Sequence, residues 1–182
     1  MADVNVAGIG GDVRRPAADG DEPPPAAIWD IIELLFFAYR DFVGDPDDVL
    51  AKFGFGRAHH RVLHFVNRNP GMKVAELLDV LKITKQSLGR VLKQLVDQGY
   101  VEQKAGENDR RQRLLYVTPR GEALAMRLAH MQSSRISRAL AELGPAGRET
   151  ARKFLLAMIN ADDRDSVLRF IARADRVRVP RG

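Results

Sequence analysis

Six polar side chains lie close together in the middle of the chain, at spacings that put them on the outer side of one helix: Lys85, Gln86, Ser87, Arg90, Lys93 and Gln94. Amide, hydroxyl and guanidinium groups form hydrogen bonds with the edges of DNA bases, and lysine ammonium groups bind phosphates. Because an α-helix fits the major groove, this face is a candidate for reading duplex DNA. Gln86 and Ser87 lie in the first turn, where base contacts are usually made, and Arg90 follows one turn later.

Three arginines lie in a second polar segment, at the projecting end of an expected β-hairpin: Arg110, Arg111 and Arg113. The segment from Gly106 to Arg113 is too long for a two-residue turn, and it separates two short strand patterns at 100–104 and 114–118. An arginine at a loop tip can enter the narrow, electronegative minor groove. Asp109 has two interpretations, an ordinary turn residue or the partner of an arginine in an ion pair. For the cations of both elements, the alternative interpretation is a solvated basic surface.

The elements that would position these side chains form a compact series. A short helix is expected from Val74 to Leu81, followed by the connection Lys82–Ile83 and a second helix, which Thr84 caps and Gly99 ends. The second helix has a stripe that is expected to be buried: Leu88, Val91, Leu92 and Leu95. Two short helices, a tight connection and a β-hairpin are typical of a winged helix-turn-helix.

Further helices are expected on both sides of this lobe. The spacing of apolar residues and the breakers between them predict five helices and one short helical turn: 26–43, the turn Asp45–Lys52, 57–69, a long helix between Gly121 and Gly144, 148–160 and 163–174. The apolar faces at 28–39 and 154–171 come from opposite ends of the chain and exceed what one small lobe can bury. A homodimer is therefore expected.

The stretch from Val74 to Gly121 resembles the MarR family of bacterial transcriptional regulators. The resemblance rests on Asn108-Asp109-Arg110-Arg111 in the wing and on Leu115 to Gly121 at its exit, and with the flanking helices it extends over about residues 26–174. It implies a mainly α fold with a small β-hairpin wing, in which a winged helix-turn-helix lobe is joined to a helical dimerisation domain. It also implies an obligate homodimer on palindromic DNA, with Arg111 in the minor groove and Asp109 holding it or a neighbouring arginine through an ion pair.

Two features depart from the family pattern. The turn Asp45–Lys52, with Pro46 at its first helical position, lies where the family often runs from helix to helix with little interruption. Gly89 lies inside the recognition helix, the helix that follows Thr84, and costs it about 1 kcal/mol relative to alanine. Gly89 either permits a close approach to the DNA backbone or is simply tolerated.

These patterns divide the chain into five segments: a disordered N-terminal arm at 1–25, N-terminal dimerisation helices at 26–55, a winged DNA-binding domain at 56–121, C-terminal dimerisation helices at 122–174 and a basic tail at 175–182. The arm has four glycines, four prolines and no apolar period. It has two basic and five acidic residues, a net charge of −3, so the other 157 residues have 27 basic and 19 acidic residues, a net charge of +8. This charge favours a polyanion as partner, nucleic acid ahead of a membrane surface.

Composition excludes several kinds of chemistry. The chain has no cysteine, which excludes disulfides, zinc sites built on thiolates, iron–sulfur clusters and cysteine nucleophiles. It has no phosphate-binding glycine loop and no HExxH or GxSxG motif, so we expect no enzyme activity, no cofactor and no metal. Neither a signal peptide nor a membrane span is present, so the protein is expected to be soluble and cytoplasmic, without a membrane partner.

Five side chains are candidates for an effector pocket between the dimer helices and the winged lobe: Trp29, Phe36, Tyr39, His60 and His64. Such a pocket would suit a small aromatic or phenolic effector. For the aromatic residues the alternative is an ordinary core stripe. The two histidines are four residues apart, as metal ligands on a helix are, but neither a cysteine nor a nearby carboxylate completes a site, so solvated or packed histidines are the preferred interpretation.

The sequence therefore predicts a homodimeric winged helix-turn-helix transcription factor, a ligand-responsive repressor that binds a palindromic operator. The alternative is a winged-helix module that docks another protein without binding DNA directly. Salt-dependent binding of duplex DNA separates the two functions.

Overall fold

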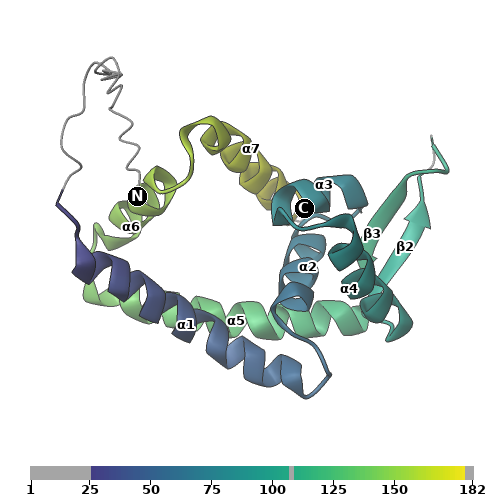
Figure 1. Cartoon of the computed structure of the whole chain (residues 1–182), viewed down its shortest axis with the longest axis horizontal. Helices are drawn as coiled ribbons and strands as arrows, with labels where there is room; N and C mark the ends of the chain where they lie inside the picture. Colours follow the sequence, from purple (N-terminus) through teal and green to yellow (C-terminus); the bar gives the residue numbers. More distant parts are fainter. Residues whose placement is uncertain (1–25, 107–108, 179–182) are drawn as a thin grey trace, which may run out of the picture.

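The computed structural model describes residues 26–106 and 109–178 and has a mainly helical fold with one small sheet (Figure 1). The elements follow in the order α1 (Trp29–Ala51), α2 (Arg57–Arg68), β1 (Met72–Lys73), α3 (Val74–Leu81), α4 (Lys85–Asp97), β2 (Val101–Ala105), β3 (Arg113–Val117), α5 (Pro119–Glu142), α6 (Gly147–Ala157) and α7 (Ala161–Arg178). The predicted fold class, mainly α with a small β-hairpin wing, is confirmed. The expected N-terminal arm lies outside the described residues. None of the described helices combines the length and the apolar character that crossing a membrane requires.

The helices place a small lobe at one end of a longer helical frame. α1 and α5 lie side by side, and the lobe that contains α2, α3, α4 and the sheet lies at one end of this pair (Figure 1). α6 and α7 return from the other end of α5, and α7 reaches the lobe again. There Phe170 of α7 packs edge-on against Phe65 of α2, with ring centroids 5.8 Å apart, and Arg173 pairs with Glu76 of α3 at 3.0 Å. The lobe is therefore held by the chain on both sides.

The hydrophobic core is centred on the lobe but includes the ends of the flanking helices. The fully buried leucines include one each from α1, α2, α3, α4, β3 and α5: Leu50, Leu63, Leu77, Leu95, Leu115 and Leu128. They belong to one continuous cluster. The core thus crosses both expected boundaries of the winged domain, 56 and 121, because the end of α1 and the beginning of α5 pack against α2.

The first helix is longer than the sequence predicts. The prediction of a separate turn at Asp45–Lys52 is wrong, because α1 continues without interruption to Ala51 with Pro46 inside it. A proline inside a helix removes one backbone hydrogen bond and distorts the turn before it. Here burial of Pro46 itself helps to offset that cost, and the neighbouring Asp45 adds a weak, partly exposed ion pair with Arg135 of α5 at 2.8 Å.

A third strand joins the predicted hairpin. β1 pairs antiparallel with β3, so that the strand order is β1-β3-β2. Gly71, immediately before β1, has φ of 79° and donates its N–H to the carbonyl of Leu115 at 2.8 Å. A Cβ atom at Gly71 would lie 3.0 Å from the hydroxyl of Tyr116, so glycine suits both this backbone conformation and this space. Two residues are too few to produce an alternating pattern, and sequence analysis missed this strand.

The other predicted helices agree with α2, α3, α4, α5 and α6 to within a few residues. The last helix differs at its end, since α7 continues to Arg178 rather than ending at 174. Part of the segment expected to be a basic tail is therefore helical, and residues 179–182 lie outside the described residues.

Candidate nucleic-acid interface

The turn between α3 and α4 is built from local contacts that the sequence predicts in part. Thr84 is the N-cap of α4, as predicted: its Oγ1 accepts the backbone N–H of Ser87 at 3.1 Å, and its hydroxyl donates to the Oγ of Ser87 at 2.9 Å. Lys82, which ends α3, has φ of 51°, a left-handed conformation that is costly for a residue with a Cβ atom. At the start of α3, the carboxylate of Glu76 accepts the N–H of Lys73 at 2.8 Å. These contacts define the first turn of each helix and the end of α3.

α4 has one buried and one exposed face. The predicted inner stripe is confirmed, since Leu88, Val91, Leu92 and Leu95 are all buried in the lobe core. The outer face exposes five of the six predicted side chains: Lys85, Gln86, Ser87, Arg90 and Lys93. Lys93 pairs with Asp97 one turn later at 2.6 Å, but both side chains are more than half exposed, so the pair is weak and Lys93 can exchange its partner for a phosphate.

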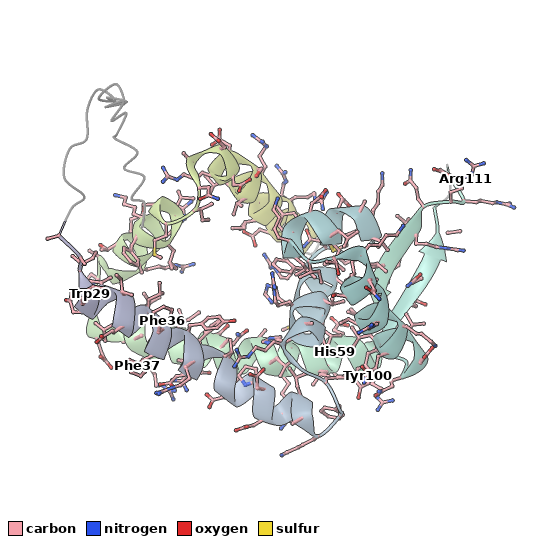
Figure 2. All side chains as sticks on the ribbon, in the orientation of Figure 1. Trp29, Phe36, Phe37, His59, Tyr100 and Arg111 are labelled. Carbon is pink, nitrogen blue, oxygen red and sulfur yellow. The ribbon has the colours of Figure 1, made fainter. Side chains whose placement is uncertain are left out.

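Gln94 has contacts inside the protein that the sequence does not predict. Its Nε2 donates to the carbonyl of Gly54 at 3.1 Å, and its Oε1 lies 2.9 Å from Nε2 of His59 (labelled in Figure 2). His59 stacks on Phe55 with ring centroids 4.8 Å apart, and its Nδ1 accepts the N–H of Gly56 at 3.1 Å, so its Nε2 carries the proton that Gln94 accepts. Both ends of the Gln94 amide are thus used inside the protein. In this structure Gln94 ties α4 to the segment before α2, and the DNA contact expected of Gln94 stays a prediction.

The wing projects from the lobe as the sequence predicts. β2 and β3 pair antiparallel, with Val101 opposite Val117 at the base and Ala105 opposite Arg113 near the tip. Figure 2 places Arg111 at the outer end of this hairpin. The three wing arginines named by the sequence are all exposed. No carboxylate of the described residues lies within ion-pair distance of any of them.

Asp109 uses its carboxylate for the turn and not for an ion pair. Its Oδ1 accepts the backbone N–H of Arg111 at 2.9 Å, and its carbonyl accepts the N–H of Gln112 at 3.0 Å. Such a contact to the residue two positions later is the usual way in which Asp supports a turn. Within the described residues Asp109 has no ion pair with an arginine side chain, so its contacts agree with the turn interpretation and the ion pair stays a prediction.

The base of the wing is fastened to the end of α4 by residues that sequence analysis missed. Tyr100 is buried against Phe55, with ring centroids 5.1 Å apart at 77°. The guanidinium of Arg120 lies over the Tyr100 ring, 4.3 Å from its centroid, and donates to the carbonyl of Gln98 at 3.0 Å. The hydroxyl of Thr118 donates to the carbonyl of Gly99 at 2.7 Å. The wing and α4 are therefore parts of one rigid unit. Thr118 and Arg120 lie in the segment 115–121 that carries the family resemblance, but their residue types did not indicate these contacts.

The five candidate effector residues have different surroundings in this chain. Trp29 and Phe36 are 68% and 69% exposed on the first half of α1, and Tyr39 is also exposed. His60 is buried in the core, and burial lowers its pKa despite the opposing effects of Asp47 and Gln132. His64 packs edge-on against Phe65. Among the described residues no three His, Asp or Glu side chains are grouped to hold a metal ion.

A cavity of about 730 Å³ lies elsewhere, between α3 and α7. Its walls include Phe65, Val80, Val167 and Phe170, and both acidic and basic side chains lie around them, among them Glu76 and Arg173. None of the five candidate effector residues is part of its lining. The cavity lies between α3 of the winged lobe and α7 of the C-terminal helices, in keeping with the expected place between the dimer helices and the lobe, whereas the five named residues lie outside its lining and their effector role stays a prediction.

The geometry described above defines a class of protein. Two short helices joined by a tight turn, with a polar outer face on the second and an arginine-bearing hairpin beside it, form a winged helix-turn-helix domain. A family model described as the MarR family matches residues 53–112. The HTH-type transcriptional regulator PetP of Rhodobacter capsulatus is 46% identical over 129 residues, which cover 71% of this chain and 78% of PetP. The chain belongs to the MarR family and is a transcriptional regulator of that type.

Solved structures of this fold include complexes with DNA. Streptococcus pneumoniae FabT in complex with DNA has a TM-score of 0.65 and 16% identity to this chain, and the match covers 72% of this chain and 94% of FabT. A MarR family regulator from Listeria monocytogenes, complexed with 26mer DNA, has a TM-score of 0.62 and 20% identity, over 78% of this chain and 92% of that one. At these identities the likeness shows the fold.

Proposed function

We propose that the protein represses transcription in the cytoplasm by binding a palindromic operator as a homodimer, with one α4 helix on each half-site. The observation that carries this proposal is the charge of α4 and the wing. Five exposed cations on these elements have no carboxylate partner in the described part of the chain: Lys85, Arg90, Arg110, Arg111 and Arg113. Cations in such an arrangement neutralise phosphates and release counterions, which supplies much of the affinity for DNA.

The dimer is supported by apolar side chains that one chain leaves uncovered. Phe36 of α1 is 69% exposed, and Leu155 and Met158 near the end of α6 are 58% and 52% exposed. Other large apolar residues of these two regions are exposed as well: Ile28, Trp29, Ile31, Leu34, Phe37 and Phe154. Large apolar patches are rare on monomeric proteins and mark interfaces. A second copy on this face would join the segments 26–55 and 122–174 of two chains into one dimerisation domain.

The proposal is tested by selecting duplexes from a random library with the full chain and then titrating a selected duplex at several salt concentrations. A DNA-binding protein has an affinity that falls steeply with salt and prefers the selected duplex to an unrelated one. A module that docks only another protein selects no sequence and binds no duplex at any salt concentration.

Replacing Arg90 with alanine is expected to weaken binding of the selected duplex by about 1–3 kcal/mol and to relax the sequence preference. Arg90 is exposed one turn into α4, beside Gln86 and Ser87, which we assign to base contacts, whereas Lys85 and Lys93 are assigned to phosphates. The matched control is Arg138→Ala, which removes an exposed arginine from α5 outside the lobe. Unchanged affinity and unchanged preference in Arg90→Ala would place α4 away from the bases.

For the wing we expect Arg111→Ala to lower the affinity by about 1–3 kcal/mol, most strongly on duplexes with A·T-rich flanks, because a guanidinium is attracted into a narrow minor groove. Asp109→Ala is expected to cost less, since its carboxylate supports the turn through the N–H of Arg111. Asp109→Asn keeps that acceptor oxygen and is expected to bind as the wild type does. If Asp109→Asn loses as much affinity as Asp109→Ala, the charge of Asp109 matters and the turn contact does not explain its role.

We also propose that a small aromatic or phenolic effector controls DNA binding. The cavity between α3 and α7 supports this, because about 730 Å³ with apolar walls suits a small organic molecule. α3 belongs to the helix-turn-helix and α7 to the C-terminal helices, so an occupant would change how the lobe is held. Adding a panel of small phenols to the DNA titration tests the proposal. An effector is expected to lower the affinity for the selected duplex, and an unchanged affinity with every phenol would contradict the proposal.

A further inference from the structure

Gly89 lies in the middle of α4, at a position where nothing in the fold requires a glycine. Its backbone is helical, without the positive φ that favours glycine elsewhere in this chain. A Cβ atom built on Gly89 would have no heavy atom within 4 Å, so no neighbouring group excludes a side chain. Glycine is, after proline, the poorest helix former. Alanine at this position would make the folded chain more stable in the absence of DNA.

The position of Gly89 on α4 indicates its role. Residues three and four positions apart share a helix face, which places Gly89 beside Gln86 and between Lys85 and Lys93. All three neighbours are exposed and polar, and Gly89 itself is exposed. Gly89 therefore leaves a bare strip of backbone at the centre of the side chains assigned above to bases and phosphates.

We infer that Gly89 is the point at which the backbone of α4 approaches the base edges most closely, and that its missing side chain determines sequence specificity. This inference rests on the proposed function. A helix with its side chains is about 10–12 Å across and the major groove is about 12 Å wide, so the fit leaves little room. A methyl group at position 89 would keep the helix farther from the floor of the groove. The hydrogen bonds that Gln86 and Arg90 make to the bases would then become longer, and such bonds can lengthen by only a few tenths of an ångström before they weaken.

Gly44 provides a matched control, because it lies in the second half of α1, beyond the exposed apolar residues 28–39 that the proposed dimer covers. It also lies inside a helix, α1, and a Cβ atom there would likewise have no heavy atom within 4 Å. Gly44→Ala and Gly89→Ala are both expected to raise the melting temperature by about 1–4 °C, because alanine favours the helix in each case. Only Gly89→Ala is expected to affect DNA: about tenfold weaker binding of the selected duplex, but roughly threefold or less on an unrelated duplex.

The experiment measures thermal unfolding of the three full-length chains and their affinity for both duplexes at one salt concentration. A more stable Gly89→Ala chain that has lost specific affinity supports the inference. A Gly89→Ala chain that binds the selected duplex as the wild type does overturns it, and so does an equal loss on both duplexes, which would indicate contact with phosphates. If the wild type binds neither duplex, the proposed function fails together with the inference, so the two failures are distinguishable.

Discussion

Leu155→Glu is expected to convert the dimer into monomers at micromolar concentration and to weaken operator binding by roughly a hundredfold or more. Leu155 is 58% exposed in one chain, so a glutamate there leaves the folding of that chain unaffected. In the proposed dimer, however, symmetry would place two carboxylates in an apolar interface, and a buried unpaired charge costs several kcal/mol. In a dimer, binding of one lobe raises the effective concentration of the other lobe at the second half-site. In a monomer this gain in affinity is lost, and each lobe binds its half-site alone.

The measurement combines light scattering with titration of the selected duplex. Lys153→Glu is the matched control, because it puts the same carboxylate on the opposite side of the same helix, where the Lys153 side chain is 75% exposed. This control is expected to remain dimeric. A Leu155→Glu chain with the mass of a dimer would contradict the proposed interface, and a wild-type chain that is monomeric at micromolar concentration would contradict the dimer.

Gly121→Ala is expected to destabilise the whole lobe by about 3 kcal/mol or more. A Cβ atom at Gly121 would lie 1.9 Å from the carbonyl oxygen of Tyr100, a contact with rigid backbone that no side-chain rotation relieves. That carbonyl also accepts the N–H of Thr118 at 3.1 Å, and the Oγ1 of Thr118 accepts the N–H of Gly121. The clash would therefore separate α5 from the base of the wing, and urea unfolding measures the loss.

Gly56→Ala is the control for this prediction. Gly56 precedes α2, has φ of −136°, which alanine adopts readily, and has open space where the Cβ atom would be. Its effect is expected to stay within about 1 kcal/mol. If the urea concentration at the midpoint of unfolding is the same for Gly121→Ala and the wild type, α5 does not approach Tyr100 as closely as the structure indicates.

The recognition lobe could be predicted from the sequence because its signals are local. Thr84 and Gly99 mark the ends of α4, and Leu88, Val91, Leu92 and Leu95 repeat with the helical period, so one face had to be buried. The five exposed polar residues of α4 and the wing arginines followed from the same period and from the strand patterns beside them. Local chemistry was sufficient to determine these elements.

Sequence patterns did not indicate the features that depend on contacts between residues far apart in the chain. Pro46 has the residue type of a helix breaker, but it is buried inside an uninterrupted α1, and the residue type alone does not indicate that burial. Gln94 has the residue type and spacing of a DNA contact, but its partners, Gly54 and His59, lie 40 and 35 residues away in the sequence. The spacing of residues in the sequence indicates on which face of a helix a side chain lies. It does not indicate which hydrogen-bond partners the side chain has in the folded chain.

The shared core of the lobe and the flanking helices has a consequence for the operator. Leu50 of α1 and Leu128 of α5 are buried in the same cluster as the leucines of α4. No flexible linker therefore separates α4 from the helices that we propose to form the dimer. The distance between the two α4 helices in the proposed dimer is then a fixed property of the protein. One base pair inserted between the half-sites turns the second half-site by about 35° around the duplex axis. The spacing of the operator is thus specified as strictly as its sequence.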